Sequence, residues 1–547
     1  MSDDRVDGSA PASVTGWWTG RVGYEIYIRS FADSDGDGVG DLRGILGHLD
    51  HLVDLGVDVV WITPFYPSPM ADFGYDVADY RDIDPLFGTL ADFDALVAAL
   101  HDAGLRLLVD LVPNHTSDQH PWFRASRSGR DDPHRDWYIW RDPAPDGGPP
   151  NNWVSHFGGP AWTFDEATGQ YYLHLFLPEQ PDLNWRNPAV VEAFDDILTF
   201  WLDRGVDGFR IDVAHALVKD AELRDNPQVR PVTPDMHPRE VFWSFDHVHD
   251  LTQPESLEIF RRWRTLCDAR DAVLLGETYV REPERLAPYL AGDGLHLGFW
   301  FGTMTMRWSA PELRRVVDDA LAVAPNGVAW VLSSHDDLRA PTRFGGGREG
   351  RERALALMTL LTSLPGFPVI FQGDELALED ARIPPDRLAD PVAVRNGGVL
   401  GRDGCRSPLP WGSGVSYGFS TNPDPWLPLG ERREDETVAG QRGRPDSPLA
   451  TTRRLLAVRR QLPALVDASM TWVDLVARPT PPPDRAPVAF TRGDVLVVVN
   501  PADESVAVDL DRPRRPVFST RHPDVDDAIV TAHTLGPREA LIAVAAP

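Results

Sequence analysis

Eight short apolar runs, rich in Val, Ile and aromatic residues, alternate with helical patterns through most of this 547-residue chain. Such alternation is typical of parallel α/β folds, because each parallel strand needs a crossover helix before the next. Eight repeats predict an α/β fold of the (β/α)₈ type, the TIM barrel. Its active site lies at the carboxyl ends of the strands. The runs are 24–31, 57–65, 106–115, 206–213, 272–278, 296–301, 329–336 and 368–376.

The helix expected between the second and third runs shows how clear the local signals are. Thr89 and Asp92 have the spacing of a capping box, and Gly104 is placed to end the helix. The apolar residues between them fall on one helical face, so this helix should pack its face against the barrel. These residues are Leu90, Phe93, Leu96, Val97 and Leu100.

Two long interruptions divide the predicted barrel, which we assign to residues 1–112 and 187–466. The Pro-, Gly-, Trp- and His-rich segment 113–186, after the third strand, is too long for a simple crossover, so we expect an inserted domain. A second insertion at 217–256 follows the fourth strand, and we expect it to form a lid.

The character of the chain changes after the last barrel helix. A Pro-rich stretch, ARPTPPPDRAP, is followed by apolar segments at 494–500 and 540–547. This pattern predicts a small antiparallel β domain, a β-sandwich, over residues 467–547.

Composition excludes several classes of function. The formal net charge is −30, which argues against nucleic acid and anionic membranes as partners, because both require a basic face. Only two cysteines occur, Cys267 and Cys405, so a disulfide framework is not expected. The N-terminal segment lacks the pattern of a secretory signal, and no run of about 18 apolar residues occurs. We therefore expect a cytoplasmic protein, and its oligomeric state stays open.

An acidic residue ends the fourth strand beside an arginine. In VDGFRIDVAH the period of two places Gly208, Arg210 and Asp212 on one strand face. An arginine that close should hold the carboxylate ionised, as a nucleophile requires. The alternative is a buried Arg–Asp pair that only stiffens the barrel.

Two further acids end strands five and seven. Glu277 closes the apolar run AVLLGET, a position that suits a general acid, and Asp336 follows His335 in SSHDDLR. Taken singly, Glu277 could be a surface residue and the His-Asp pair a polar turn. Together they can meet Asp212 over one barrel mouth, as a retaining glycosidase requires, with two carboxyl groups about 5 Å apart.

Four motifs in this order resemble the signature regions of the α-amylase superfamily, glycoside hydrolase family 13. QPDLNW (180–185) and the opening YEIYIRSFADSDGDGVGDLRGI resemble its oligo-1,6-glucosidase and α-glucosidase branch. The four signature motifs are DLVPNH (110–115), GFRIDVAH (208–215), LLGET (274–278) and SHDD (334–337).

The resemblance implies a role for each matched residue. Asp212 would be the nucleophile, Glu277 the general acid/base, and Asp336 the stabiliser that binds sugar hydroxyls in the transition state. Ser334 departs from the family, which usually has Asn there, and we expect only a local change. The implied sugar contacts are His115, Arg210 and His335 around the reacting glucose, Asp72 and Arg402 behind the terminal sugar, Tyr75 under its ring, and Phe176 and Gln180 as additional contacts.

The resemblance also implies the reaction and substrate. We expect a retaining exo-α-glucosidase that releases terminal glucose from maltose, isomaltose or short oligosaccharides, with transglucosylation. Val213 is the residue that α-1,6-specific members carry, whereas Ala214 and His215 resemble α-1,4-glucosidases. The open alternatives are a sugar isomerase or transferase of the trehalose synthase type, and an α-1,6-specific oligo-1,6-glucosidase.

An acidic loop near the N-terminus has the pattern of a cation site. Oxygen ligands at alternate positions of a turn suit Ca²⁺, or Mg²⁺ with retained waters, and branch members carry a structural cation in the matching loop. The alternative is an acidic surface turn. The expected ligands are the side chains of Asp33, Asp35, Asp37 and Asp41 and the carbonyl of Val39.

Overall fold

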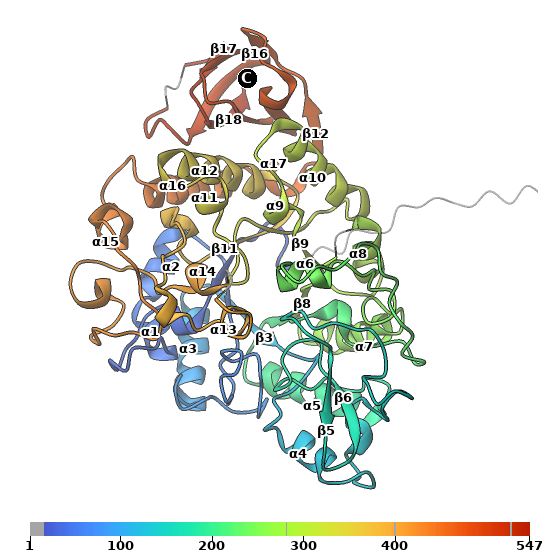
Figure 1. The fold of residues 1–547 in the computed structure, drawn as a ribbon. Coiled ribbons are helices and arrows are strands. Elements are labelled where there is room, and N and C mark those ends of the chain that lie inside the picture. The colour runs from blue at the N-terminus through green and yellow to red at the C-terminus, as the bar shows by residue number, and fades with distance from the viewer. Residues whose placement is uncertain (1–15, 281, 399–400, 526–527, 547) are drawn as a thin grey trace, which may run out of the picture.

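In the computed structural model, which describes residues 16–280, 282–398, 401–525 and 528–546, eight parallel strands close into a barrel (Figure 1). Each predicted run supplies one strand, so the (β/α)₈ prediction is confirmed. Around the barrel the order is β1-β11-β10-β9-β8-β7-β3-β2. The bounds are β1 (Gly23–Ile26), β2 (Val59–Ile62), β3 (Arg106–Leu111), β7 (Gly208–Ile211), β8 (Val273–Gly276), β9 (Leu297–Trp300), β10 (Val328–Val331) and β11 (Gly366–Phe371).

Helices surround the barrel, and the first of the long ones begins and ends as predicted. In α3 (Leu90–Asp102) the capping box of Thr89 and Asp92 is present, and Gly104 beyond it has φ of +77°. The other helices that connect successive strands are α1 (Leu42–Gly47), α2 (Leu49–Leu55), α5 (Pro188–Asp203), α7 (Ser256–Asp268), α8 (Pro283–Leu290), α9 (Gly302–Thr305), α10 (Ala310–Val323), α11 (Ala340–Arg343) and α12 (Gly347–Ser363). After β11 follow α13 (Pro391–Arg395), α14 (Asp403–Arg406), α15 (Val438–Gln441), α16 (Pro448–Gln461) and α17 (Ala464–Asp467).

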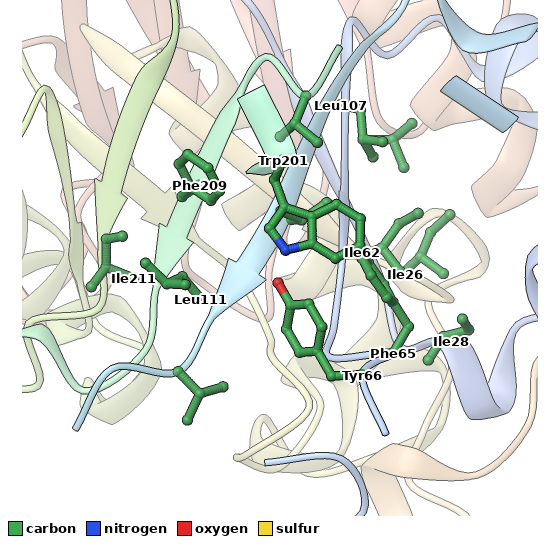
Figure 2. Close-up of a cluster of buried hydrophobic side chains, with 14 of the residues drawn as sticks. Ile26, Ile28, Ile62, Phe65, Tyr66, Leu107, Leu111, Trp201, Phe209 and Ile211 are labelled. Atoms are coloured by element: carbon green, nitrogen blue, oxygen red, sulfur yellow. The ribbon is translucent and has the colours of Figure 1, made fainter. Parts of the chain in front are cut away.

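The alternation of side chains along each strand produces two cores. In β2, Val60 and Ile62 face the helices, whereas Val59 and Trp61 belong to a separate cluster shared by the barrel strands. Figure 2 shows part of the outer core, where Trp201 of α5 lies among side chains of the barrel strands. Trp201 is fully buried, with its ring centroid 5.4 Å from that of Phe65. The barrel is therefore packed inside and outside, which leaves its mouth as the place for a site.

Two irregular segments cover that mouth. The segment after β3 contains α4 (Pro121–Ser128) and a three-stranded sheet of β4 (Trp140–Arg141), β6 (Gln170–Leu173) and β5 (Trp162–Asp165). The segment after β7 contains α6 (Pro238–Phe242). The two segments contact each other, because Trp153 Nε1 donates to the Arg224 carbonyl at 2.9 Å and Asn152 Nδ2 to that of Asn226 at 2.8 Å.

The C-terminal strands form one antiparallel sheet of seven strands in the order β12-β14-β15-β18-β16-β13, with β17 paired to β16. Apolar side chains line both faces: Val497 of β15 joins a cluster with α10 and α12, and Val498 a cluster within the sheet. Within the described part of the chain, no helix combines the length and apolar character needed to span a membrane. The strands are β12 (Met470–Val473), β13 (Val476–Arg478), β14 (Val488–Arg492), β15 (Val495–Val499), β16 (Val506–Ser519), β17 (Val530–Leu535) and β18 (Ala540–Ala545).

Candidate active site

The three predicted carboxylates line one cavity of about 1290 Å³ at the barrel mouth. Asp212 directly follows β7 and Glu277 directly follows β8, while Asp336 lies in the turn after β10. Every predicted sugar-binding residue lines the same cavity. The barrel mouth therefore brings together eleven residues that are far apart in sequence, from the strand ends and from the segments that follow them.

Arg210 joins two of the three acids. Its Nη1 donates to Asp212 Oδ1 at 2.6 Å, and its Nη2 lies 2.9 Å from Glu277 Oε2. The same guanidinium donates to Asp110 Oδ1 at 2.9 Å, because Asp110 and Arg210 are register partners on β3 and β7. Its charge also lies over the ring of Trp61, 4.9 Å from the centroid. One guanidinium thus orients the carboxylates of three adjacent strands.

The backbone after Asp212 adds a further link to Glu277. Val213 has φ of +45° and ψ of +41°, a left-handed conformation that is rare for a β-branched residue and costs about 1–3 kcal/mol. This turn directs the Val213 N–H at Glu277 Oε2, at 2.9 Å. The backbone strain is thus located between the two predicted catalytic carboxylates and positions one with respect to the other.

The electrostatics of Asp212 differ from the expectation that Arg210 alone keeps it ionised. Burial raises the pKa of Asp212 well above its ordinary value, and Glu277 and Asp110 add to the effect against the opposing charge of Arg210. Burial also raises the pKa of Asp110 to about 7. Three carboxyl groups share one guanidinium, so the cluster favours retention of a proton. A site that needs one carboxylate and one carboxylic acid requires this condition.

Asp336 has the opposite environment. Arg406 Nη2 donates to its Oδ1 at 2.7 Å, Arg402 Nη1 at 3.2 Å, and His335 Nε2 lies 3.4 Å from Oδ2. Burial opposes its charge, but His335, Arg406 and Arg402 hold the pKa of Asp336 well below the ordinary value. Asp336 is therefore a fixed negative charge, suited to accept hydrogen bonds from sugar hydroxyls.

Asp72 and Arg402 form the ion pair that the resemblance implies. Arg402 Nη2 donates to Asp72 Oδ1 at 2.6 Å, and Gln180 Nε2 lies 3.4 Å from Asp72 Oδ2. Asp390 holds the other side of Arg402 Nη2 at 3.0 Å, and the guanidinium lies 4.9 Å above the ring of Phe157. This side of the cavity is a rigid polar wall.

The aromatic groups lie beside this wall. The ring of Tyr75 stacks on His335 with a centroid separation of 5.5 Å, and its hydroxyl lies 2.8 Å from His335 Nε2. His115 Nε2 lies 3.0 Å from Gln180 Nε2, and Phe176 contacts the His115 ring at 5.2 Å. Ring faces next to charged hydrogen-bonding groups suit a sugar, which has apolar faces and a polar rim.

The N-terminal acidic loop brings three of the five predicted ligands together. Carboxylate oxygens of Asp33, Asp35 and Asp37 lie within 4.8 Å of one another. Asp41 lies outside this group: its Oδ1 accepts the Gly44 N–H and caps α1, and its Oδ2 accepts the Ser34 N–H. The Val39 N–H donates to Asp37 Oδ1 at 2.7 Å. Three clustered hard oxygens fit the donor set that Ca²⁺ prefers.

Four supporting residues were not predicted. Asp110 holds Arg210, Glu25 lies against His335 Nδ1, Arg406 holds Asp336, and Asp390 holds Arg402. Asp110 and Glu25 carried a usable signal, an acidic residue among the apolar residues of a strand. Arg406 and Asp390 carried none, because α14 and α13, the helices that they end and cap, are too short to show a periodic pattern.

Comparison with protein families agrees with this geometry. The family model described as "Alpha amylase, catalytic domain" matches residues 25–468. A probable alpha-glucosidase of Rhizobium meliloti (strain 1021) is 45% identical over 472 residues, covering 84% of this chain and 85% of that protein. An oligo-1,6-glucosidase of Parageobacillus thermoglucosidasius is 34% identical over 558 residues, covering 94% and 96%.

Solved structures are similar over nearly the whole chain. The alpha-glucosyl transfer enzyme XgtA superposes with a TM-score of 0.89 at 40% identity, covering 97% of this chain and all of that chain. The trehalulose synthase MutB of Pseudomonas mesoacidophila MX-45 gives 0.85 at 33% identity, covering 97% and 99%. A mutant of MutB has been solved with its substrate sucrose.

Proposed function

The chain belongs to the α-amylase family, glycoside hydrolase family 13, and on that basis we propose that it is a retaining, exo-acting α-glucosidase. Its relatives named alpha-glucosidase and oligo-1,6-glucosidase place it in that branch of the family. The proposed substrates are maltose, isomaltose and short oligosaccharides with a terminal α-linked glucose.

The proposed reaction has two steps. Asp212 attacks the anomeric carbon while Glu277 gives its proton to the leaving oxygen, so the glycosidic bond breaks and a glucosyl–Asp212 ester forms. Glu277 then takes a proton from water, whose oxygen displaces Asp212. Each of the two displacements inverts the anomeric carbon, so the configuration is retained overall. Arg210, which contacts both acids, limits charge repulsion between them. Asp336 would bind the 2- and 3-hydroxyls as positive charge develops on the ring.

One observation carries the exo-acting part of the proposal. Arg402, which pairs with Asp72, places its Nη1 only 3.2 Å from Oδ1 of the catalytic group Asp336. Asp390 forms a second ion pair with the same guanidinium. Charged groups this close to the reacting sugar leave a place for the hydroxyls of a terminal glucose. A chain continuing past that glucose would have to break the pair.

A transferase or isomerase is the second candidate. Two of the similar structures are named an alpha-glucosyl transfer enzyme and a trehalulose synthase. In such a reaction a sugar hydroxyl replaces water in the second step, so the same carboxylates serve. Transglucosylation at high sugar concentration is part of our proposal.

Products separate the candidates. We propose side-by-side kcat/KM measurements on maltose, isomaltose, sucrose and trehalose, with products and the anomer of released glucose followed by NMR. We expect α-glucose as the first product. Prompt β-glucose would contradict retention, and an isomeric disaccharide with little glucose would favour the isomerase. The ratio of maltose to isomaltose rates decides the linkage preference that Val213 leaves open.

The nucleophile has its own test. We expect Asp212→Asn to lower kcat by at least about a thousandfold without lowering the melting temperature, because the amide removes a charge that burial disfavours. Asp203→Asn, an exposed α5 carboxylate, is the matched control. If Asp212→Asn retained more than about one part in a thousand of kcat, another nucleophile would be required.

We also propose that the cluster of Asp33, Asp35 and Asp37 holds a structural Ca²⁺, with Mg²⁺ as the alternative. Burial and the neighbouring aspartates raise the pKa of Asp37, and a bound cation would relieve this repulsion. Ser420 and Asn422 fasten the loop to the segment that precedes α15, through Asp33 Oδ2 and the Asp37 carbonyl. The cation would therefore stabilise this part of the fold and take no part in catalysis.

A further inference from the structure

A side chain from the segment after β7 reaches across the cavity to two other strand ends. Arg239 of α6 places Nη1 2.6 Å from Asp337 Oδ1 and Nη2 3.3 Å from Asp337 Oδ2, a bidentate pair. The same guanidinium lies 5.3 Å above the Tyr279 ring and donates to its hydroxyl. All three residues line the cavity, and none belongs to the catalytic trio.

Arg239 is held in place by the packing of its short helix. The next-but-two residue, Phe242, is fully buried, and its ring stacks on His156 and on His247, each with a centroid separation of 3.7 Å. His156 stacks in turn on Phe176 at 4.7 Å, with 4° between the planes. This column of rings ties α6 to the inserted segment that carries Phe176. Arg239 is therefore presented from a packed element and not from a free loop tip.

The position of this contact relative to the chemistry defines what it can do. Tyr279 lies two residues after the acid Glu277, and Asp337 follows Asp336 directly. Since Asp72 and Arg402 would receive the terminal glucose, the leaving group lies toward Glu277 and the residues after it. The Arg239 side chain is 45% exposed and that of Asp337 is 17% exposed, so the pair lies toward the outside of the cavity.

We propose that Arg239, Asp337 and Tyr279 form a bar across the leaving-group side of the cavity that determines substrate length. The inference rests on the proposed exo-glucosidase function. One sugar, or a small aglycone, fits between Glu277 and the bar and finds a guanidinium, a carboxylate and an aromatic face to bind. A longer chain must displace the bar, although a cavity volume of about 1290 Å³ would by itself admit more than a disaccharide.

The test compares substrates that differ only in length. We would measure kcat/KM for maltose and maltotetraose and take the maltotetraose-to-maltose ratio. We expect a ratio well below one for the wild type, and an increase of about tenfold for Arg239→Ala. Arg239→Lys, which keeps the charge but loses the bidentate geometry, should give an intermediate ratio.

The same insertion offers a matched control. Arg224 and Asp220 form an Arg–Asp pair with the same 2.6 Å separation and a similar exposure, 58% and 7%, outside the described lining of the cavity. Arg224→Ala should leave the ratio unchanged. Because a half-exposed ion pair is screened by salt, about 1 M NaCl should raise the ratio for the wild type and have no such effect on Arg239→Ala.

A binding measurement separates failure of the bar from failure of the proposed function. We would measure Kd for maltose and maltotetraose by calorimetry in Asp212→Asn, with and without Arg239→Ala. Adding Arg239→Ala should increase the affinity for maltotetraose relative to maltose by the same factor as the kcat/KM ratio. If folded Arg239→Ala hydrolyses maltose and keeps the wild-type maltotetraose-to-maltose ratio, the bar is refuted and the exo-glucosidase proposal stands. If the wild type released no glucose from either sugar, the exo-glucosidase proposal would fail, and the Kd ratio would still decide the bar. Binding of neither sugar would overturn both.

Discussion

At the scale of single residues, burial decides the charge of most acids near the barrel mouth, and partners decide the exceptions. Asp336 and Asp390 have lowered pKa values because arginines surround them against the effect of burial, with the pKa of Asp390 at about 2. Asp110 and Asp374 have pKa values raised to about 7 by burial. Around the barrel mouth the fold thus keeps some carboxyl groups charged and others close to neutral.

Asp374 makes this difference measurable as a pH dependence of stability. It is 2% exposed, and one of its carboxyl oxygens is buried without a hydrogen-bond partner among the described residues. Its pKa rises from about 3.8 to about 7 on folding, so between about pH 4 and pH 7 the unfolded chain ionises first and stability falls as pH rises. The contribution of Asp374 to the free energy of unfolding is fully present below about pH 4 and is lost above about pH 7.

We therefore expect Asp374→Asn to reduce the fall in melting temperature between pH 5 and pH 8. Two pH units of linkage amount to about 3 kcal/mol, or about 2 to 3 °C for a chain of this length. Asp386→Asn, at an exposed position, is the control and should follow the wild type. Equal falls for all three proteins would show that Asp374 is ionised in the folded state without cost.

At the scale of elements, each functional group depends on where its strand or helix ends. The carboxyl end of β7 supplies Asp212, that of β8 supplies Glu277, and the N-terminus of α1 is capped by Asp41. The acidic loop before α1 belongs to this scale, because its turn, and not any single residue, brings Asp33, Asp35 and Asp37 together.

Removing the proposed cation should destabilise that loop. With Ca²⁺ at about 100 times its Kd, binding contributes about 2.7 kcal/mol, so EDTA should lower the melting temperature by about 2 °C. Asp37→Asn measured in Ca²⁺ should match the wild type in EDTA, and Asp131→Asn, an exposed acid elsewhere, should retain the EDTA response. An absence of bound metal by elemental analysis, with no EDTA effect, would refute the site.

At the scale of the whole molecule, the barrel and the C-terminal sheet share one core. Val316 of α10, Trp330 of β10 and Leu360 of α12 belong to the same buried cluster as Phe490 of β14 and Ile542 of β18. Figure 1 shows the sheet seated directly on this helical layer. Neither part can separate without exposing apolar surface, so the two should unfold together.

Calorimetry tests this coupling. Phe490 is 1% exposed, and its truncation to Ala should cost about 3–5 kcal/mol and shift a single transition downward by about 3 to 4 °C. The control is Val476→Ala in the same sheet, at a side chain that is 58% exposed. Two separate transitions, with only one moved by Phe490→Ala, would show that the sheet unfolds independently.

Much of the fold could be predicted from the sequence because its signals are local. The eight strands are short apolar runs whose pattern is complete within a few residues, and the capping box of Thr89 and Asp92 is a spacing of three. The candidate acids could also be predicted, since each follows the carboxyl end of a strand and parallel strands end on the same face. Asp212, Glu277 and Asp336 lie together for that reason.

Only the tertiary structure decided the contacts between segments that have no repeating pattern of apolar residues. Asp390 caps the short helix α13 and Arg406 ends the short helix α14, and nothing in their spacing indicates that they hold Arg402 and Asp336. Arg239 likewise meets Asp337 across 98 residues. The sequence by itself determined a barrel with acids at its mouth, because periodicity is a short-range property. The charge state of those acids and the reach of Arg239 across the cavity depend on burial and distance, which exist only once the chain has closed.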